Sequence, residues 1–197
     1  MTSSATSSAS LITRSNDFDP TLVSYKEPRL NKRGGKNVSL LTRAGGSQLI
    51  IQFPFIFTWG VNERVDETSG RVSYDLNLSF QNTDESDPTG QLFHKLKALQ
   101  EKFLDDAVEN SKLWFGKAKM SREVAEAMMY PILKYPKIKE GKGVGEPDLS
   151  RPATIKLKLQ YWDEKFNVEL YNMNKDQIFG PNTETDKTPM ELVPSRS

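Results

Sequence analysis

The sequence predicts an α+β protein, mainly β, in which alternating strands stand on either side of a helical block. Apolar and polar residues alternate over 49–59, 72–80, 153–161 and 166–171, and a period of two is typical of antiparallel strands with one buried face. Over 88–133 the apolar residues instead recur every three or four positions, which indicates helices. The length of 197 residues suits one domain with tails.

The strands before the helical block begin with two apolar runs. Gly45 and Gly46 lie between these runs and predict a hairpin turn. Pro54, within the second run, requires an edge strand or a bulge because proline cannot donate to a strand ladder. Residues 61–71 are polar and predict a loop. The clearest strand follows, with five positions expected to face inward: Val72, Tyr74, Leu76, Leu78 and Phe80.

Two helices are expected in the block. Asp87 predicts an N-cap, and Pro88 suits the first helical turn. Gly116 predicts the end of this first helix. The second helix is expected to begin at Ser121 and to bend or stop near Pro131.

The helical block is followed by a basic loop over 134–152, rich in Gly and Pro, and then by a hairpin with a tight turn at 163–165. Lys156 and Lys158 occupy alternate, outward positions of the first hairpin strand. Strand geometry places them about 7 Å apart, which matches successive phosphates. Lysines on an exposed strand also protect a sheet edge from pairing, and both interpretations stay open.

The order of elements indicates how the chain is organised. Residues 1–20 are small and polar and predict a disordered tail, and 176–197 predict a flexible one. The domain between them, 21–175, carries the helical insert at about 88–133. Short antiparallel strands interrupted by helices match the OB-fold, a partly open five-stranded barrel. Other α+β folds, and a sandwich with a helical excursion, share this order.

Composition excludes several kinds of chemistry. The chain has no cysteine, and its single histidine is His94, so a disulfide framework, a thiol nucleophile, a thiolate zinc site and a common catalytic triad are excluded. Residues 143–147 lack the lysine and the helix of a phosphate-binding loop. A carboxylate-only magnesium site stays open. We therefore expect no enzymatic activity and no cofactor.

The N-terminal sequence and the overall hydropathy bear on localisation. Residues 1–10 have neither the basic region nor the apolar region of a secretory signal. Apolar runs fall well short of the roughly 18 residues that span a bilayer. Together with the absence of cysteine, these features predict an intracellular protein in a reducing compartment, without a membrane partner.

Charge is segregated along the chain although the net charge is only +1. Residues 26–43 hold six basic side chains and one acid, 112–142 hold eight basic side chains and three acids, and 61–87 hold seven acids and two arginines. This layout can present one positive face to nucleic acid, although most charged runs are simply solvated. The basic residues expected to contact DNA are Lys32, Arg33, Lys36, Arg43, Lys117, Lys119, Lys137, Lys139, Lys156 and Lys158.

Aromatic residues lie beside the basic blocks. Base stacking on such rings contributes roughly 1–3 kcal/mol per base and tolerates any sequence. Rings in phase with the buried face are expected in the core: Phe53, Phe55, Phe57, Tyr74, Phe80 and Phe103. Those at strand ends or on the outward phase are candidates for stacking as well as for packing: Trp59, Tyr161, Trp162 and Tyr171.

Residues 110–137, with Trp-Phe-Gly-Lys at 114–117, resemble a motif of a protein family of large eukaryotic DNA viruses. That family is similar to the single-stranded-DNA-binding proteins of phage replication. Residues 149–172 and 73–80 fit the same family, and the resemblance covers about 16–175.

The resemblance implies an OB-fold that coats single-stranded DNA in viral replication or repair, contacts with viral replication proteins, and a location in the host nucleus or a cytoplasmic viral factory. It carries Lys117, Lys119, Lys156 and Lys158 over as the nearest DNA contacts. One feature departs from the phage type, because the chain ends in MELVPSRS rather than in an acidic tail with a terminal aromatic residue.

Three functions remain to be distinguished. The first is non-catalytic, largely sequence-independent binding of single-stranded DNA. The second is a virion-associated or structural domain that binds protein and no nucleic acid. The third is an RNA-binding module that recognises the 2′-hydroxyl group. Self-association is compatible with each of them.

Overall fold

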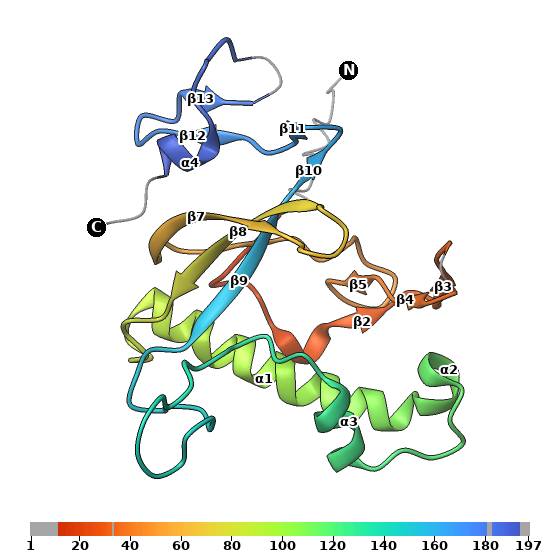
Figure 1. Cartoon of the computed structure of the whole chain (residues 1–197). Coiled ribbons are helices and arrows are strands. Elements are labelled where there is room, and N and C mark those ends of the chain that lie inside the picture. The colour runs from red at the N-terminus through yellow and green to blue at the C-terminus, as the bar shows by residue number, and fades with distance from the viewer. Residues whose placement is uncertain (1–11, 33, 181–182, 194–197) are drawn as a thin grey trace, which may run out of the picture. The chain divides into compact units, whose positions relative to one another are not determined.

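The structure, a computed structural model, describes residues 12–32, 34–180 and 183–193 (Figure 1). The protein is α+β with several antiparallel sheets, as the sequence predicts. Within the described ranges none of these sheets closes into a barrel. The expected OB-type barrel is therefore not confirmed, because most strands are only two residues long and pair with a single neighbour.

The chain forms two compact units, where one domain over 21–175 was expected. The first unit comprises Met1–Phe55 and Asn82–Ile132, and the second comprises Ile56–Gln81 and Leu133–Ser197. The helical block thus associates with the N-terminal segment, and the long strands associate with the C-terminal segment.

The first unit has six short strands and a 3-10 helix before its α-helices: β1 (Thr13–Arg14), η1 (Pro20–Leu22), β2 (Ser24–Tyr25), β3 (Arg29–Leu30), β4 (Lys36–Asn37), β5 (Leu40–Leu41) and β6 (Ile51–Gln52). β1 pairs with β6 in parallel, whereas β2 pairs with β5 and β3 with β4 in antiparallel fashion. The expected turn at Gly45 and Gly46 is confirmed, since Thr42 N donates to Ser47 O at 2.9 Å.

Three helices fill the expected block: α1 (Pro88–Glu109), α2 (Ser111–Phe115) and α3 (Arg122–Met128). The Asp87 carboxylate caps α1 by accepting from Thr89 N at 2.7 Å. Gly116 ends α2 in the left-handed conformation, with φ of 70°, and Ser121 caps α3. The expected helix starts and the Gly116 stop are thus confirmed, but the first expected helix is interrupted at Asn110.

The end of the expected N-terminal tail is ordered. Thr13 N donates to Ile50 O at 2.8 Å, and Ser15 N donates to Gln52 O at 3.0 Å. Phe18 is buried, and Lys95 on α1 donates to the Ser15 carbonyl at 2.9 Å. Residues 12–20 therefore belong to the first unit, and the rest of the expected tail, 1–11, lies outside the described residues.

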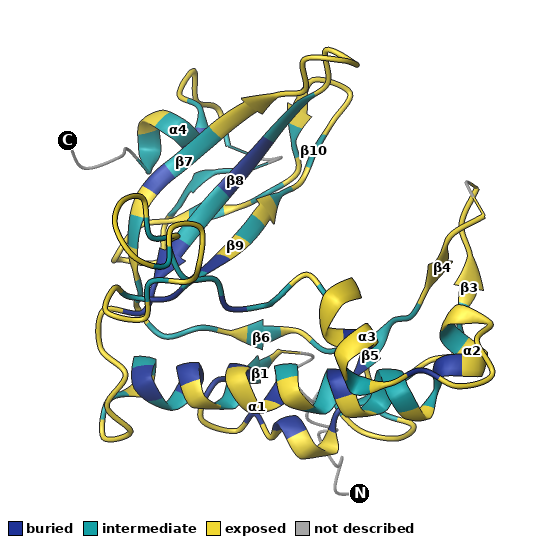
Figure 2. Ribbon diagram, turned by 60° about the horizontal axis from the view of Figure 1, so that its bottom comes forward, coloured by how far each residue is buried: buried dark blue, intermediate teal, exposed yellow. Residues whose placement is uncertain are grey.

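The second unit is built on an antiparallel sheet of three strands in the order β7 (Phe57–Val65), β8 (Val72–Ser79) and β9 (Thr154–Leu159). β8 is central and has no exposed residue (Figure 2). The apolar run 49–59, expected as one strand, is divided between β6 and β7, because Pro54 interrupts the ladder. Of the expected loop 61–71, residues 61–65 form the second half of β7, and residues 66–71 form the turn that leads to β8.

The C-terminal segment completes the second unit. It contains β10 (Tyr161–Trp162), β11 (Lys165–Phe166), β12 (Leu170–Tyr171), β13 (Gln177–Phe179) and α4 (Pro189–Leu192). β10 pairs with β11 across the expected tight turn, where Asp163 and Glu164 have φ of 48° and 60°.

The apolar face of the sheet packs against this segment. The Tyr74 ring on β8 lies 4.6 Å from the Phe166 ring, which in turn lies 6.1 Å from Phe179. Pro189 is fully buried, and Val61 N on β7 donates to Val193 O at 3.3 Å. The described part of 176–197 is therefore packed rather than flexible, because Phe179, Pro189 and Val193 each contact the rest of the unit or are buried in it.

Replacing Phe179 with Ala should destabilise the protein by about 1–3 kcal/mol, since a half-buried ring leaves the aromatic cluster. Urea unfolding measures this change. Met173→Ala, an exposed position in the same segment, is the control and should stay within about 0.5 kcal/mol. Equal small effects of both substitutions would mean that the segment is loose.

Stability should also fall in alkali because of Tyr74. Burial, and then the hydrogen bond from its hydroxyl to Glu63 at 2.8 Å, raise the pKa of Tyr74 from 10.0 to about 12. The unfolded phenol ionises near pH 10 while the folded one keeps its proton, so this contribution is present below pH 10 and lost between pH 10 and 12. The free energy of unfolding, measured in urea, should fall less steeply between pH 10 and 12 for Tyr74→Phe than for the unmodified protein. Parallel declines for the two proteins would contradict the assignment.

Candidate nucleic-acid interface

One face of the β7–β8–β9 sheet is polar. In the strand register, Asp75 lies opposite Asn62 on β7 and opposite Lys158 on β9, and Asn77 lies opposite Lys156. Because side chains alternate along a strand, these residues share one face. The same alternation puts Tyr74, Leu76 and Leu78 on the opposite, apolar face.

Asp75 is the centre of the polar face and is only 4% exposed. Its Oδ2 atom lies 2.5 Å from Nε of Arg64 and 3.3 Å from Nζ of Lys156. Asn77 donates to its other oxygen at 3.4 Å. The one acid on these strands that faces this side is thus covered and neutralised by two cations, and the Arg64 side chain remains more than half exposed.

Lys158 is the exposed cation next to this cluster. Within the described part of the chain it takes part in no ion pair. It lines a shallow pocket together with Arg71, Ser73 and Trp162. The Trp162 side chain is 57% exposed at the β10–β11 hairpin, so a ring and two cations meet at this end of the sheet.

A pair of rings lies at the other end of the sheet. Phe57 and Trp59 pack edge to face with centroids 5.1 Å apart, and Trp59 is 41% exposed. A bulge follows at Gly60, which has φ of 92°. At the bulge the Thr58 hydroxyl accepts from Gly60 N at 3.2 Å. Phe57 lies opposite Ser79 and therefore on the polar face, and Trp59 lies beside it on the same face.

The polar face therefore carries exposed rings at both ends and cations between them. The two ends lie near Ser73 and Ser79 of β8, which are six positions apart, a distance of about 20 Å in an extended strand. Cations, rings and amide side chains along such a path can bind phosphates and unstacked bases.

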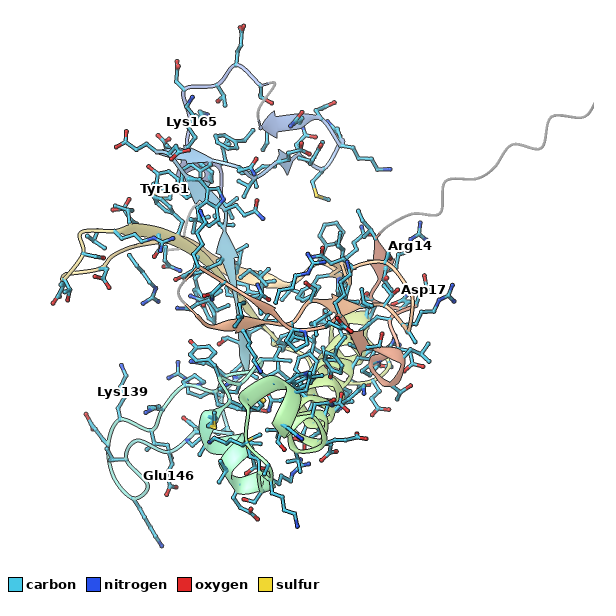
Figure 3. All side chains as sticks on the ribbon, turned by 90° about the vertical axis from the view of Figure 1, so that its right-hand side faces the viewer. Arg14, Asp17, Lys139, Glu146, Tyr161 and Lys165 are labelled. Atoms are coloured by element: carbon cyan, nitrogen blue, oxygen red, sulfur yellow. The ribbon has the colours of Figure 1, made fainter. Side chains whose placement is uncertain are left out.

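Several residues predicted to contact DNA lie elsewhere in the second unit. The Tyr161 ring packs in the core at 4.8 Å from Tyr74 and 4.9 Å from Phe166, so it is not on the polar face. Tyr171 is exposed on β12 and donates to Glu169 at 2.7 Å. Lys137 and Lys139 lie on the long loop before β9, where Figure 3 shows Lys139 and Glu146 on the same loop.

The remaining predicted contacts belong to the first unit. Lys32, Lys36, Arg43, Lys117 and Lys119 are all exposed there, and Arg33 lies outside the described residues. Lys36 Nζ donates to the Leu113 carbonyl at 2.5 Å. These residues belong to a different unit from the polar face. The members of the predicted set that the second unit brings together on this face are Trp59, Lys156, Lys158 and Trp162.

Sequence reasoning missed three members of the face: Phe57, Arg64 and Arg71. Phe57 was assigned to the core by its phase, which the bulge at Gly60 shifts. Phe55, assigned to the core in the same way, is 89% exposed. Arg64 lies two positions after Asn62 and therefore faces the same side of β7. A strand predicted to continue into the expected loop 61–71 would have placed Arg64 on the polar face.

In the described ranges no group of three or more His, Asp or Glu side chains is arranged to hold a metal ion. The helices in that part of the chain are too short or too polar to cross a bilayer.

Comparisons of the chain with protein-family models, with curated proteins and with solved structures give no match. Its function is therefore inferred from the geometry of the polar face.

Proposed function

We propose that the protein binds single-stranded DNA, without catalysis and with little sequence preference, on the polar face of the β7–β8–β9 sheet. One observation carries this proposal: exposed rings stand at both ends of a face whose only strand-borne acid is buried beneath two cations. Arg64, Arg71, Lys156 and Lys158 pair with phosphates. Phe57, Trp59 and Trp162 stack on bases.

The chemistry of the face favours a single strand over a duplex. A half-exposed ring can stack only on a base whose own faces are free, and bases in a duplex are already stacked. Every base has such a face, so binding by stacking and by phosphate contacts is largely independent of sequence.

The resemblance of residues 110–137 supports a role in replication or repair of a large DNA virus, beside viral replication proteins. In this proposal the sheet corresponds to the binding sheet of an OB-type fold. The order of two strands, a helical block and a further strand with a hairpin supports that correspondence.

Replacing Lys156 and Lys158 together with Glu should weaken binding to a labelled dT oligonucleotide at least tenfold. Fluorescence anisotropy over a salt series measures the affinity. The slope of log affinity against log salt should become shallower by about 1.4, because each phosphate contact on a single strand contributes about 0.7. Unfolding in urea checks that the double variant stays folded, since Lys156 neutralises Asp75.

Lys175→Glu with Lys187→Glu, at two exposed positions of the C-terminal segment, is the charge-matched control and should leave the affinity within about twofold. Duplex DNA and RNA of the same length complete the series. Unchanged affinity in the double variant would remove β9 from the interface, and equally weak binding to all three nucleic acids would leave only non-specific attraction.

The rings should contribute independently of the charges. Trp59→Ala and Trp162→Ala should each lower the affinity for dT oligonucleotide about 5- to 100-fold, which corresponds to a loss of roughly 1–3 kcal/mol of stacking. Trp59→Phe keeps a flat ring and should retain most of the affinity. Trp114→Phe, in the first unit, should have no effect. If Trp59→Ala and Trp162→Ala leave the affinity as unchanged as Trp114→Phe does, stacking is not the source of binding.

A further inference from the structure

The first unit contains an apolar groove that the polar face of the sheet does not use. Its volume is about 240 Å³. Its floor is the buried cluster of Leu104, Met120 and Ala125. The walls come from β2, β5 and the three helices, and they include Tyr25, Leu40, Phe103, Trp114, Phe115 and Met128.

One wall of the groove is held rigidly. The Tyr25 ring packs edge to face on Trp114 at 4.7 Å, and its hydroxyl donates to Asp106. Lys102 pairs with the same carboxylate at 2.7 Å and lies 5.7 Å above the Tyr25 ring. Tyr25 and Trp114 are therefore fixed before any ligand arrives, which lowers the entropy cost of binding.

The opposite wall is adaptable and exposed. Met128 is 52% exposed, and Phe115 is nearly as open to solvent. Unbranched thioether side chains adjust to irregular apolar surfaces, and methionines are common in grooves that bind peptides. Leu113 and Val124 extend the exposed apolar surface beside the groove. An exposed apolar patch of this kind marks an interaction surface.

The charges around the groove are positive near α2. Lys36 reaches the Leu113 carbonyl, and Lys117 Nζ lies 3.7 Å from Sδ of Met128 on the rim. Residues 111–119 contain three lysines and no acid. On the side of α1 and α3 the charge is different, because Arg122 pairs with Glu101, Asp105 and Glu126, and Glu123 is a further acid on α3. The rim beside α2 therefore attracts a negatively charged ligand.

We propose that this groove docks a short acidic segment of a partner protein, whose apolar or aromatic side chains enter the groove while its carboxylates pair with Lys36 and Lys117. Nucleic acid does not fit the groove as well, because the lining offers almost no hydrogen-bonding groups to a base and the cations stand only at the rim. This inference concerns a different unit from the proposed DNA interface and does not depend on it.

The test uses the full chain and a fluorescein-labelled ten-residue peptide in which Phe and Leu stand three positions apart among aspartates and glutamates. In one control peptide Ala replaces Phe and Leu, and in another Lys replaces every acid. By fluorescence anisotropy, the first peptide should bind at least tenfold more tightly than either control. Equal binding of all three peptides would overturn the proposal.

Two variants then locate the site. Met128→Asp puts a charge on the apolar rim, and Lys36→Glu with Lys117→Glu reverses the positive rim. Each should weaken peptide binding at least tenfold and leave dT binding within twofold. Met173→Asp, a matched change at a position that is 83% exposed in the second unit, should leave peptide binding unchanged. Equal losses in Met128→Asp and Met173→Asp would overturn the assignment to the groove.

Discussion

The buried carboxylate of Asp75 is the constraint on which the sheet of the second unit depends. Arg64 on β7 and Lys156 on β9 both reach this carboxylate on β8, so a single acid joins all three strands. A buried charge without partners costs several kcal/mol, and removing one partner of such a cluster typically costs about 3–5 kcal/mol. Asp75 therefore fixes the register of the strands and holds both cations on the same face.

This arrangement also explains why the polar face can attract an anion. Seven acids lie between residues 61 and 87, and acids on the surface of the sheet would repel DNA. The structure places Asp75 under two cations and turns Glu63 to the opposite face, where it accepts from Tyr74. Both faces of β8 are consequently buried, one by aromatic rings and the other by the long side chains of its neighbours.

Local signals predicted what depends on neighbouring residues, namely the cap at Asp87, the left-handed stop at Gly116, the cap at Ser121 and the alternation of β8. They could not predict pairings that close long loops, such as β1 with β6, since nothing near Thr13 specifies Ile51. For the same reason the two units and the packed C-terminal segment were missed. In the candidate site, Lys156, Lys158 and Trp162 were predicted from the alternation of the strand or from the position at the hairpin turn. Arg64 could not be predicted without knowing that β7 continues to Val65.

The two lysine-rich surfaces show why charge alone does not identify a ligand. A lysine at residue 117 and one at residue 158 contribute equally to any count of basic residues. Lys158 lines a pocket together with Arg71 and the exposed indole ring of Trp162, a combination that fits phosphates and bases. At 117 the neighbour is a methionine on the rim of an apolar groove, which fits an apolar side chain beside a carboxylate. The surface around each cation, rather than the cation itself, therefore decides whether a nucleic acid or an acidic protein segment is the better ligand.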